Sequence, residues 1–163
     1  MSMFCFQCQE AAKGTGCTIK GVCGKTDDVA NLQDTLMYVL KGISWYNEKL
    51  RAENLNPEKV DKFVFDGLFS TITNANFDKI SFEKRINNAL RLRDELHQKC
   101  VGNNISLPAE LPDFATWSAT TIEEFEAKAD EVGVLSTENE DIRSLRELVI
   151  YGVKGMAAYA EHA

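Results

Sequence analysis

The chain has 163 residues, of which 44% are hydrophobic and 26% are charged, as in ordinary globular domains. This composition excludes collagen, coiled-coil fibres and intrinsic disorder, and the length suffices for one core without disulfide bonds. Asp and Glu number 25 against 18 Lys and Arg, so the net charge is −7. Because an acidic protein repels phosphate backbones and anionic lipid surfaces, we expect no nucleic-acid partner and no membrane partner.

The compartment is indicated by the apolar runs and by the cysteines. No apolar run approaches the 18 or so residues of a membrane helix, and the N-terminus reaches Gln7, Gln9 and Glu10 before a signal-peptide core forms. We therefore expect a cytoplasmic protein. In that reducing compartment, the five cysteines are expected to be metal ligands or reactive thiols rather than disulfides.

The first part of the chain has no regular period. Residues 1–26 show neither helical nor strand spacing and hold four of the ten glycines, which predicts a loop built around a ligand. From Thr26 onward the pattern changes, because apolar residues recur at helical spacing behind Thr26 as an N-cap. A long first helix is predicted over about 27–53.

Two further helices follow before the first strong break. Asn56 as N-cap and Pro57 at the first helical position predict a second helix that runs to about residue 73. Ser81 is expected to cap a third helix, which ends where Gly102 takes a positive φ.

The second half begins with a connector rich in turn formers, in which Phe114 and Trp117 are expected to pack against the helices. Thr121 and Glu124 fit a capping box ahead of a short helix over 121–132, and a last helix is predicted over about 138–162. No stop signal precedes Ala163, so we expect a fragment of a longer protein. The sequence thus predicts an all-α fold of about five helices in four parts: a cysteine-rich loop (1–26), a first helical bundle (27–102), a connector (103–120) and the unfinished start of a second helical unit (121–163).

Four of the five cysteines form the main chemical motif, with the spacing C-x2-C-x8-C-x5-C. Four thiolates are the ligand set of a cubane iron–sulfur cluster, and such soft ligands also select zinc or copper(I). Three lysines against one glutamate give residues 1–26 a positive field, which offsets the negative charge of a thiolate-ligated cluster. The candidate metal and cofactor ligands are Cys5, Cys8, Cys17 and Cys23.

Other interpretations of these residues stay open on spacing alone. A structural zinc site also uses four cysteines, and Cys5 with Cys8 fits a redox-active thiol pair or a thiol-based sensor. Phe4 and Phe6 either shield the site from water or are ordinary packing residues. Elsewhere, Cys100 is expected to be a buried, inert thiol.

The sequence also contains one carboxylate–histidine pair at the spacing of a metal-binding motif. Asp94 and His97 have the i, i+3 spacing used in di-iron bundles, but the second such motif is missing, so we expect His97 to be a surface side chain. His162 is expected on a solvated helix face.

Several short segments carry a resemblance to a known family. The opening MFCFQCQE, the later GCT and GVCGK, the LQD that begins at Leu32 and the final YGVKGMAAYAEHA closely resemble the N-terminal helical domain of the hybrid cluster proteins. That family is also called the prismane proteins or hydroxylamine reductases. The resemblance covers essentially the whole chain, and its cysteine motif is specific.

The resemblance implies a fold, a cofactor and an activity. It implies a [4Fe–4S] cluster held by the four cysteines that match Cys5, Cys8, Cys17 and Cys23, with helices arranged as paired three-helix bundles. The family reduces hydroxylamine to ammonia, and nitric oxide reduction has also been assigned to it. A redox donor protein would supply the electrons.

This sequence departs from the family in its length. Family members are much longer, and their hybrid iron–sulfur–oxygen cluster, where the small-molecule substrate reacts, takes its ligands from later domains. After Cys23 this chain offers only Cys100, His97 and His162. The resemblance therefore implies an oxidoreductase whose catalytic residues lie outside this chain, so that these 163 residues alone are inactive.

Overall fold

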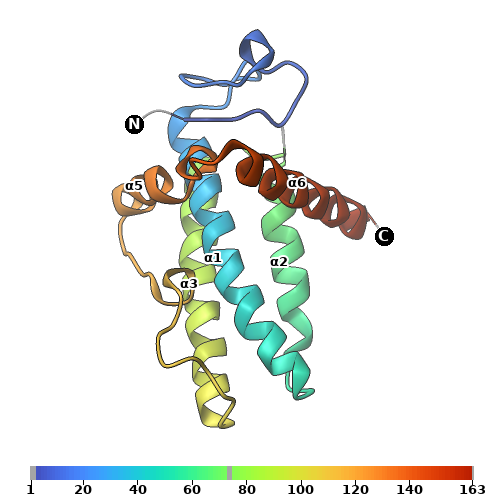
Figure 1. Cartoon of the computed structure of the whole chain (residues 1–163), viewed down its shortest axis with the longest axis vertical. Helices are drawn as coiled ribbons and strands as arrows, with labels where there is room; N and C mark the ends of the chain where they lie inside the picture. Colours follow the sequence, from blue (N-terminus) through green and yellow to red (C-terminus); the bar gives the residue numbers. More distant parts are fainter. Residues whose placement is uncertain (1–2, 73–74, 163) are drawn as a thin grey trace.

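The computed structural model describes residues 3–72 and 75–162, which are helical apart from loops and one isolated bridge. Three long helices form an up-and-down bundle in which α1 lies between α2 and α3 (Figure 1). α1 contacts both neighbours. The predicted all-α class is confirmed. The three helices are α1 (Asp27–Ala52), α2 (Glu58–Ser70) and α3 (Lys79–Gly102).

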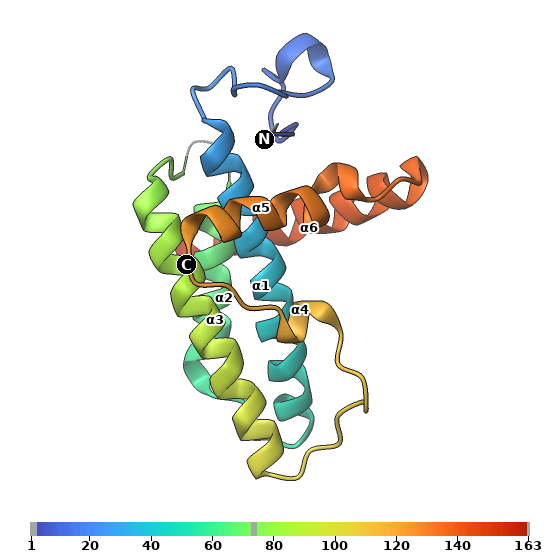
Figure 2. The same cartoon turned by 90° about the vertical axis from the view of Figure 1, so that its left-hand side faces the viewer.

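Two later helices cross this bundle near the end that carries the N-terminal loop (Figure 2). The one-turn helix α4 (Asp113–Thr116) and α5 (Ile122–Val132) pack on α1, whereas α6 (Glu140–His162) packs on α2. The described elements also include two 3-10 turns, η1 (Ala12–Gly14) and η2 (Val134–Ser136). Among the helices of these described ranges, none has the length and apolar character needed to cross a membrane.

The core is centred on α1 because its apolar residues return to one side at every turn. Leu32, Leu36, Val39, Ile43 and Leu50 are all inaccessible to solvent, as the helical spacing predicts. Side chains from α3 and α5, including a fully buried phenylalanine from each, close over them. The bundle therefore has a core of its own, separate from the N-terminal loop.

Two predicted features of α3 are wrong. Asp78 rather than Ser81 caps the helix, because its carboxylate accepts from the backbone N–H groups of Ile80 (2.9 Å) and Ser81 (3.2 Å). At the other end, Gly102 is the last helical residue, and the left-handed conformation falls on Asn104 (φ 54°). Asparagine tolerates that region better than most residues do.

The start of α2 also differs from the prediction. Pro57 is the N-cap, and neither it nor Asn56 caps the helix with a side-chain bond. Thr26 does precede α1, but its hydroxyl donates to the side chain of Asp28 rather than accepting from the backbone.

The connector packs against the helical core through the two aromatic residues predicted to do so. Phe114 and Trp117 are half-buried and pack against the core. The capping box is confirmed, since Thr121 Oγ1 accepts from the N–H of Glu124 (3.3 Å) while the Glu124 carboxylate accepts from the N–H of Thr121 (3.0 Å).

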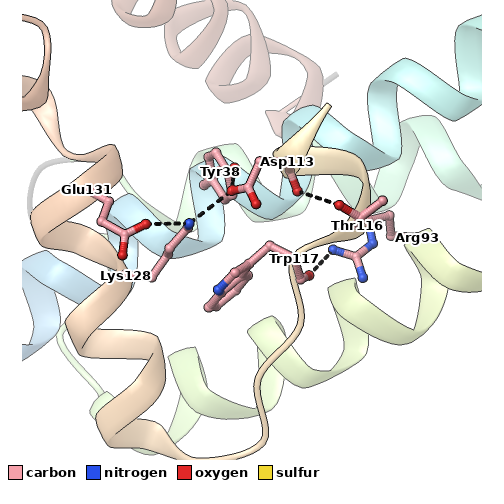
Figure 3. A network of polar contacts seen from close by, with 7 residues as sticks. All are labelled: Tyr38, Arg93, Asp113, Thr116, Trp117, Lys128 and Glu131. Atoms are coloured by element: carbon pink, nitrogen blue, oxygen red, sulfur yellow. Dashed lines mark hydrogen bonds and ion pairs between the residues drawn. The ribbon is translucent and has the colours of Figure 1, made fainter. Parts of the chain in front are cut away.

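A buried cation ties the connector to α1 and α5 (Figure 3). Lys128 is only 7% exposed, and its ammonium donates to Asp113 (2.9 Å) and Glu131 (2.7 Å). It also lies 5.1 Å from the ring centroid of Tyr38 and 5.5 Å from that of Trp117. Two carboxylates and two aromatic faces thus compensate the charge of one lysine.

This arrangement predicts an unequal cost for two lysine substitutions. Lys128→Met should lower the free energy of unfolding by about 2 kcal/mol, because charge-assisted bonds at a buried site are lost. The control is Lys62→Met, whose side chain is 71% exposed beside Asp66. We expect a change of less than about 0.5 kcal/mol there. Urea unfolding of both variants gives the comparison, and equal losses would contradict the assigned role of Lys128.

Candidate functional site at the cysteine loop

Residues 3–25 form a loop over one end of the bundle, next to the start of α1 (Figure 1). An antiparallel bridge closes the loop: the Cys5 N–H donates to the Cys17 carbonyl (3.0 Å), and the Cys17 N–H donates to the Cys5 carbonyl (2.8 Å). A small apolar cluster of Met3, Cys17 and Ala30 anchors the loop to α1. The bridge fixes two of the four predicted ligands side by side.

All four predicted ligands are free thiols on this one loop. Cys17 is buried, Cys5 and Cys8 are half-buried, and Cys23 is exposed. Within residues 3–72 and 75–162, no three Cys, His, Asp or Glu side chains gather in an arrangement that could hold a metal ion. The structure therefore brings Cys5 and Cys17 together and does not place a third ligand with them.

Two of the sulfur atoms already face N–H donors. The backbone N–H of Ala12 lies 3.5 Å from Cys17 Sγ, and Lys25 Nζ lies 3.9 Å from Cys5 Sγ. Lys25 is 2% exposed and is oriented by a 2.7 Å bond to Gln33 Oε1. Four soft sulfur ligands, two of them facing N–H donors, are a donor set that fits an iron–sulfur cluster.

One glycine and two aromatic residues shape the same loop. A Cβ atom on Gly21 would lie 3.0 Å from Cys23 Sγ, so the absence of a side chain lets the backbone approach this sulfur. Phe4 and Phe6 lie with ring centroids 5.6 Å apart. Phe4 is half-buried, whereas Phe6 is 41% exposed, so Phe4 is the better placed of the two to exclude water.

A group of polar residues that the sequence analysis missed lies beneath the loop, where α1 and α6 meet it: buried Lys154 with half-buried Asp34 and Glu147. Lys154 of α6 is 6% exposed, and its ammonium lies 3.1 Å from the Gln7 side-chain amide, whose oxygen accepts from it when the amide is oriented with the oxygen towards the lysine. Asp34 of α1, Glu147 and Lys154 line one small cavity together with Cys5. The available signal was a lysine placed inside the otherwise apolar segment 148–160.

Burial perturbs the protonation of this polar group. It raises the pKa of Asp34 to about 7, against the opposing effect of Lys154. Burial also lowers the pKa of Lys154 to about 8. Glu147 is affected in the same direction as Asp34, since burial raises its pKa. The underside of the loop thus carries less charge near neutral pH than its side chains suggest.

Asp34→Asn is expected to stabilise the folded chain at pH 8 and to have little effect at pH 4. The pKa of Asp34 is raised from an ordinary 3.8, so the unfolded chain releases this proton first and stability falls as pH rises from 4 to 7. Asparagine has no such proton, and we expect a gain of about 2 kcal/mol above pH 7. Urea unfolding of both proteins across this range tests it, and a gain that does not vary with pH would contradict the assignment.

The remaining candidate residues lie away from the loop. Cys100 is fully buried as predicted, and burial raises the pKa of its thiol. The surface position predicted for His97 is wrong: its ring is half-buried and stacks on Tyr46 with centroids 5.3 Å apart. Asp94 bonds to Arg93 instead of pairing with this histidine.

The fold and the site together define an all-helical protein with an N-terminal thiol-rich loop. Residues 3–163 match the Prismane/CO dehydrogenase family, so the chain belongs to that family. The resemblance to the prismane proteins is thereby confirmed.

Three similar proteins are all named hydroxylamine reductase. The chain is 64% identical over 163 residues to a hydroxylamine reductase of Desulfitobacterium hafniense (strain DSM 10664 / DCB-2). It is 58% identical to hydroxylamine reductases of Clostridium novyi (strain NT) and of Bacteroides thetaiotaomicron. Each match covers 100% of this chain and 29% or 30% of the relative, so the chain spans less than one third of the length of these relatives.

Proposed function

We propose that Cys5, Cys8, Cys17 and Cys23 bind one [4Fe–4S] cluster, and that this chain is the electron-transfer part of a hydroxylamine reductase. The observation that carries the proposal is that four free thiols share the loop of residues 3–25, with two of them adjacent. The relatives are named hydroxylamine reductase, which supports hydroxylamine as the substrate. Since the chain spans less than one third of them, the reduction of hydroxylamine is proposed for the whole protein.

The reduction of hydroxylamine requires electrons, and we propose that the cysteine loop delivers them. Reduction of hydroxylamine breaks the N–O bond and consumes two electrons and two protons, giving ammonia and water. When bound, the cluster supplies the electron-transfer centre. Lys25 Nζ lies 3.9 Å from Cys5 Sγ, and the Ala12 N–H faces Cys17 Sγ, so both sulfur atoms have a hydrogen-bond donor of the kind that tunes an iron–sulfur cluster.

Within the described part of the chain, no second group of candidate metal ligands gathers outside the loop. Cys100 lies in the core of the bundle, His97 stacks on Tyr46 and His162 lies beside Phe69 at the far end of α6. We therefore place the catalytic centre, the hybrid iron–sulfur–oxygen cluster, in the part of the relatives that this chain does not span. A redox donor protein is the proposed partner, and the five free thiols support a cytoplasmic location.

The test uses anaerobic protein reconstituted with iron and sulfide. Dithionite should bleach its visible absorbance reversibly, and addition of hydroxylamine with a reduced dye should yield no ammonia. Ammonia formation by these 163 residues would contradict the proposed division of labour. Binding of zinc in place of iron and sulfide would contradict the electron-transfer role.

A further inference from the structure

Gln7 lies between Cys5 and Cys8 in the sequence, and contacts from two helices hold it. Phe6 beside it is 41% exposed, whereas Gln7 is half-buried in the cavity that the loop shares with α6. The hydroxyl of Tyr151 on α6 donates to the backbone carbonyl of Gln7 at 3.1 Å. The main chain between two proposed ligands is therefore tied to α6.

The side chain of Gln7 makes two further contacts. When its amide oxygen faces Lys154, the oxygen accepts from the ammonium at 3.1 Å, and the amide nitrogen donates to the backbone carbonyl of Thr71 at 3.2 Å. This orientation gives each amide atom a partner of the opposite kind, because an ammonium only donates and a carbonyl only accepts. Lys154 is 6% exposed and Thr71 is fully buried, so both partners are shielded from water.

These contacts come from a fixed pair of helices. Tyr151 and Lys154 are three residues apart on α6, so they lie on one face of that helix. Thr71 is the C-cap residue of α2, and α2 packs on α6. We call the three partners the Gln7 clamp: Tyr151, Lys154 and Thr71. The clamp joins the turn between two cysteines to the place where α2 and α6 meet.

We propose that Gln7 is a positioning residue of the cluster site, held by its clamp so that Cys5 and Cys8 present their sulfur atoms to one cluster. The backbone bridge to Cys17 fixes Cys5, and the clamp fixes the chain on its way from there to Cys8. The inference rests on the proposed function, because it takes these cysteines as ligands. Loss of groups that orient metal ligands typically lowers metal affinity by about 10–100-fold.

The experiment measures how fast the anaerobically reconstituted chain releases iron to an excess of chelator. Tyr151→Phe removes one hydroxyl and one hydrogen bond, so release should be about fivefold faster. Gln7→Ala removes both side-chain contacts, and release should be roughly tenfold faster or more. The controls are Tyr159→Phe, at an 84% exposed tyrosine of α6, and Gln9→Ala, at the exposed glutamine on the other side of Cys8. Both should release iron at the rate of the unsubstituted chain.

Two further readouts separate positioning from general stability. The electron paramagnetic resonance spectrum of the dithionite-reduced cluster depends on how its thiolates are oriented. Its g values should therefore shift in Gln7→Ala and stay unchanged in Gln9→Ala. Without metal, Tyr151→Phe should unfold at the same urea concentration as the unsubstituted chain, because Tyr151 is 58% exposed and its hydroxyl lies outside the core.

The outcomes distinguish this inference from the proposed function. If the unsubstituted chain holds a [4Fe–4S] cluster and Tyr151→Phe and Gln7→Ala release iron at its rate, the clamp does not position the ligands, and the proposed function stands. If the chain holds zinc instead, the proposed function fails. Release of zinc from the same variants then decides on the clamp, and equal rates overturn it. A chain that binds neither overturns both.

Discussion

Gly42→Ala is expected to destabilise the chain by about 3 kcal/mol, because this buried glycine of α1 is where the connector touches the bundle. A Cβ atom there would lie 2.3 Å from the carbonyl oxygen of Phe114 and 3.0 Å from Arg93 Cδ. The carbonyl belongs to the backbone of α4, and Arg93 is itself 1% exposed. Neither neighbour is a free side-chain end that can turn away, so the connector must shift as a unit.

The control for Gly42→Ala is the same substitution in α6. At Gly152 a Cβ atom meets nothing within 4 Å, so alanine should stabilise the isolated chain by about 1 kcal/mol through helix propensity. Urea unfolding followed by circular dichroism measures both variants. Changes of the same sign would contradict the close contact between α1 and the connector.

Cys17→Ser is expected to abolish assembly of the cluster. Cys17 is the buried member of the adjacent pair, it pairs with Cys5 through two backbone bonds, and its sulfur accepts from the Ala12 N–H. A serine hydroxyl is a hard, weakly acidic ligand that does not replace a thiolate. The iron content and the visible absorbance after anaerobic reconstitution should both fall to background.

The same substitution at Cys100 is the matched control. Cys100 is as buried as Cys17 but lies in the core of the bundle, next to the carbonyl of Tyr46. Cys100→Ser should keep the full iron content. If Cys17→Ser also keeps it, Cys17 is not a ligand, and the assignment of the loop must be revised.

The fold was predictable because its core follows one rule. The apolar residues of α1 recur at helical spacing, and the five that mark this period are fully buried. Helix ends were harder to predict, because several polar residues compete for each cap. Asp78 and Ser81 both precede the apolar part of α3, and only tertiary structure selects the first.

The sequence predicts the site only as a set of candidate ligands, the four cysteines of one loop. The spacing of the cysteines identifies the thiols but not the buried side chains that surround them. Lys154 approaches the loop from α6 and Asp34 approaches it from α1, two segments that are far apart in sequence. Such convergence depends on how α6 crosses the bundle, which a local pattern does not contain.

The binding of an iron–sulfur cluster by the cysteine loop is tested most directly by the content of iron, zinc and acid-labile sulfide per chain. The content is measured on protein purified without oxygen and compared with the visible spectrum of the same sample. We expect about four irons and four sulfides per chain with broad brown absorbance, the composition of one cubane cluster. One zinc per chain without sulfide would contradict it and would make the cysteine loop a structural metal site.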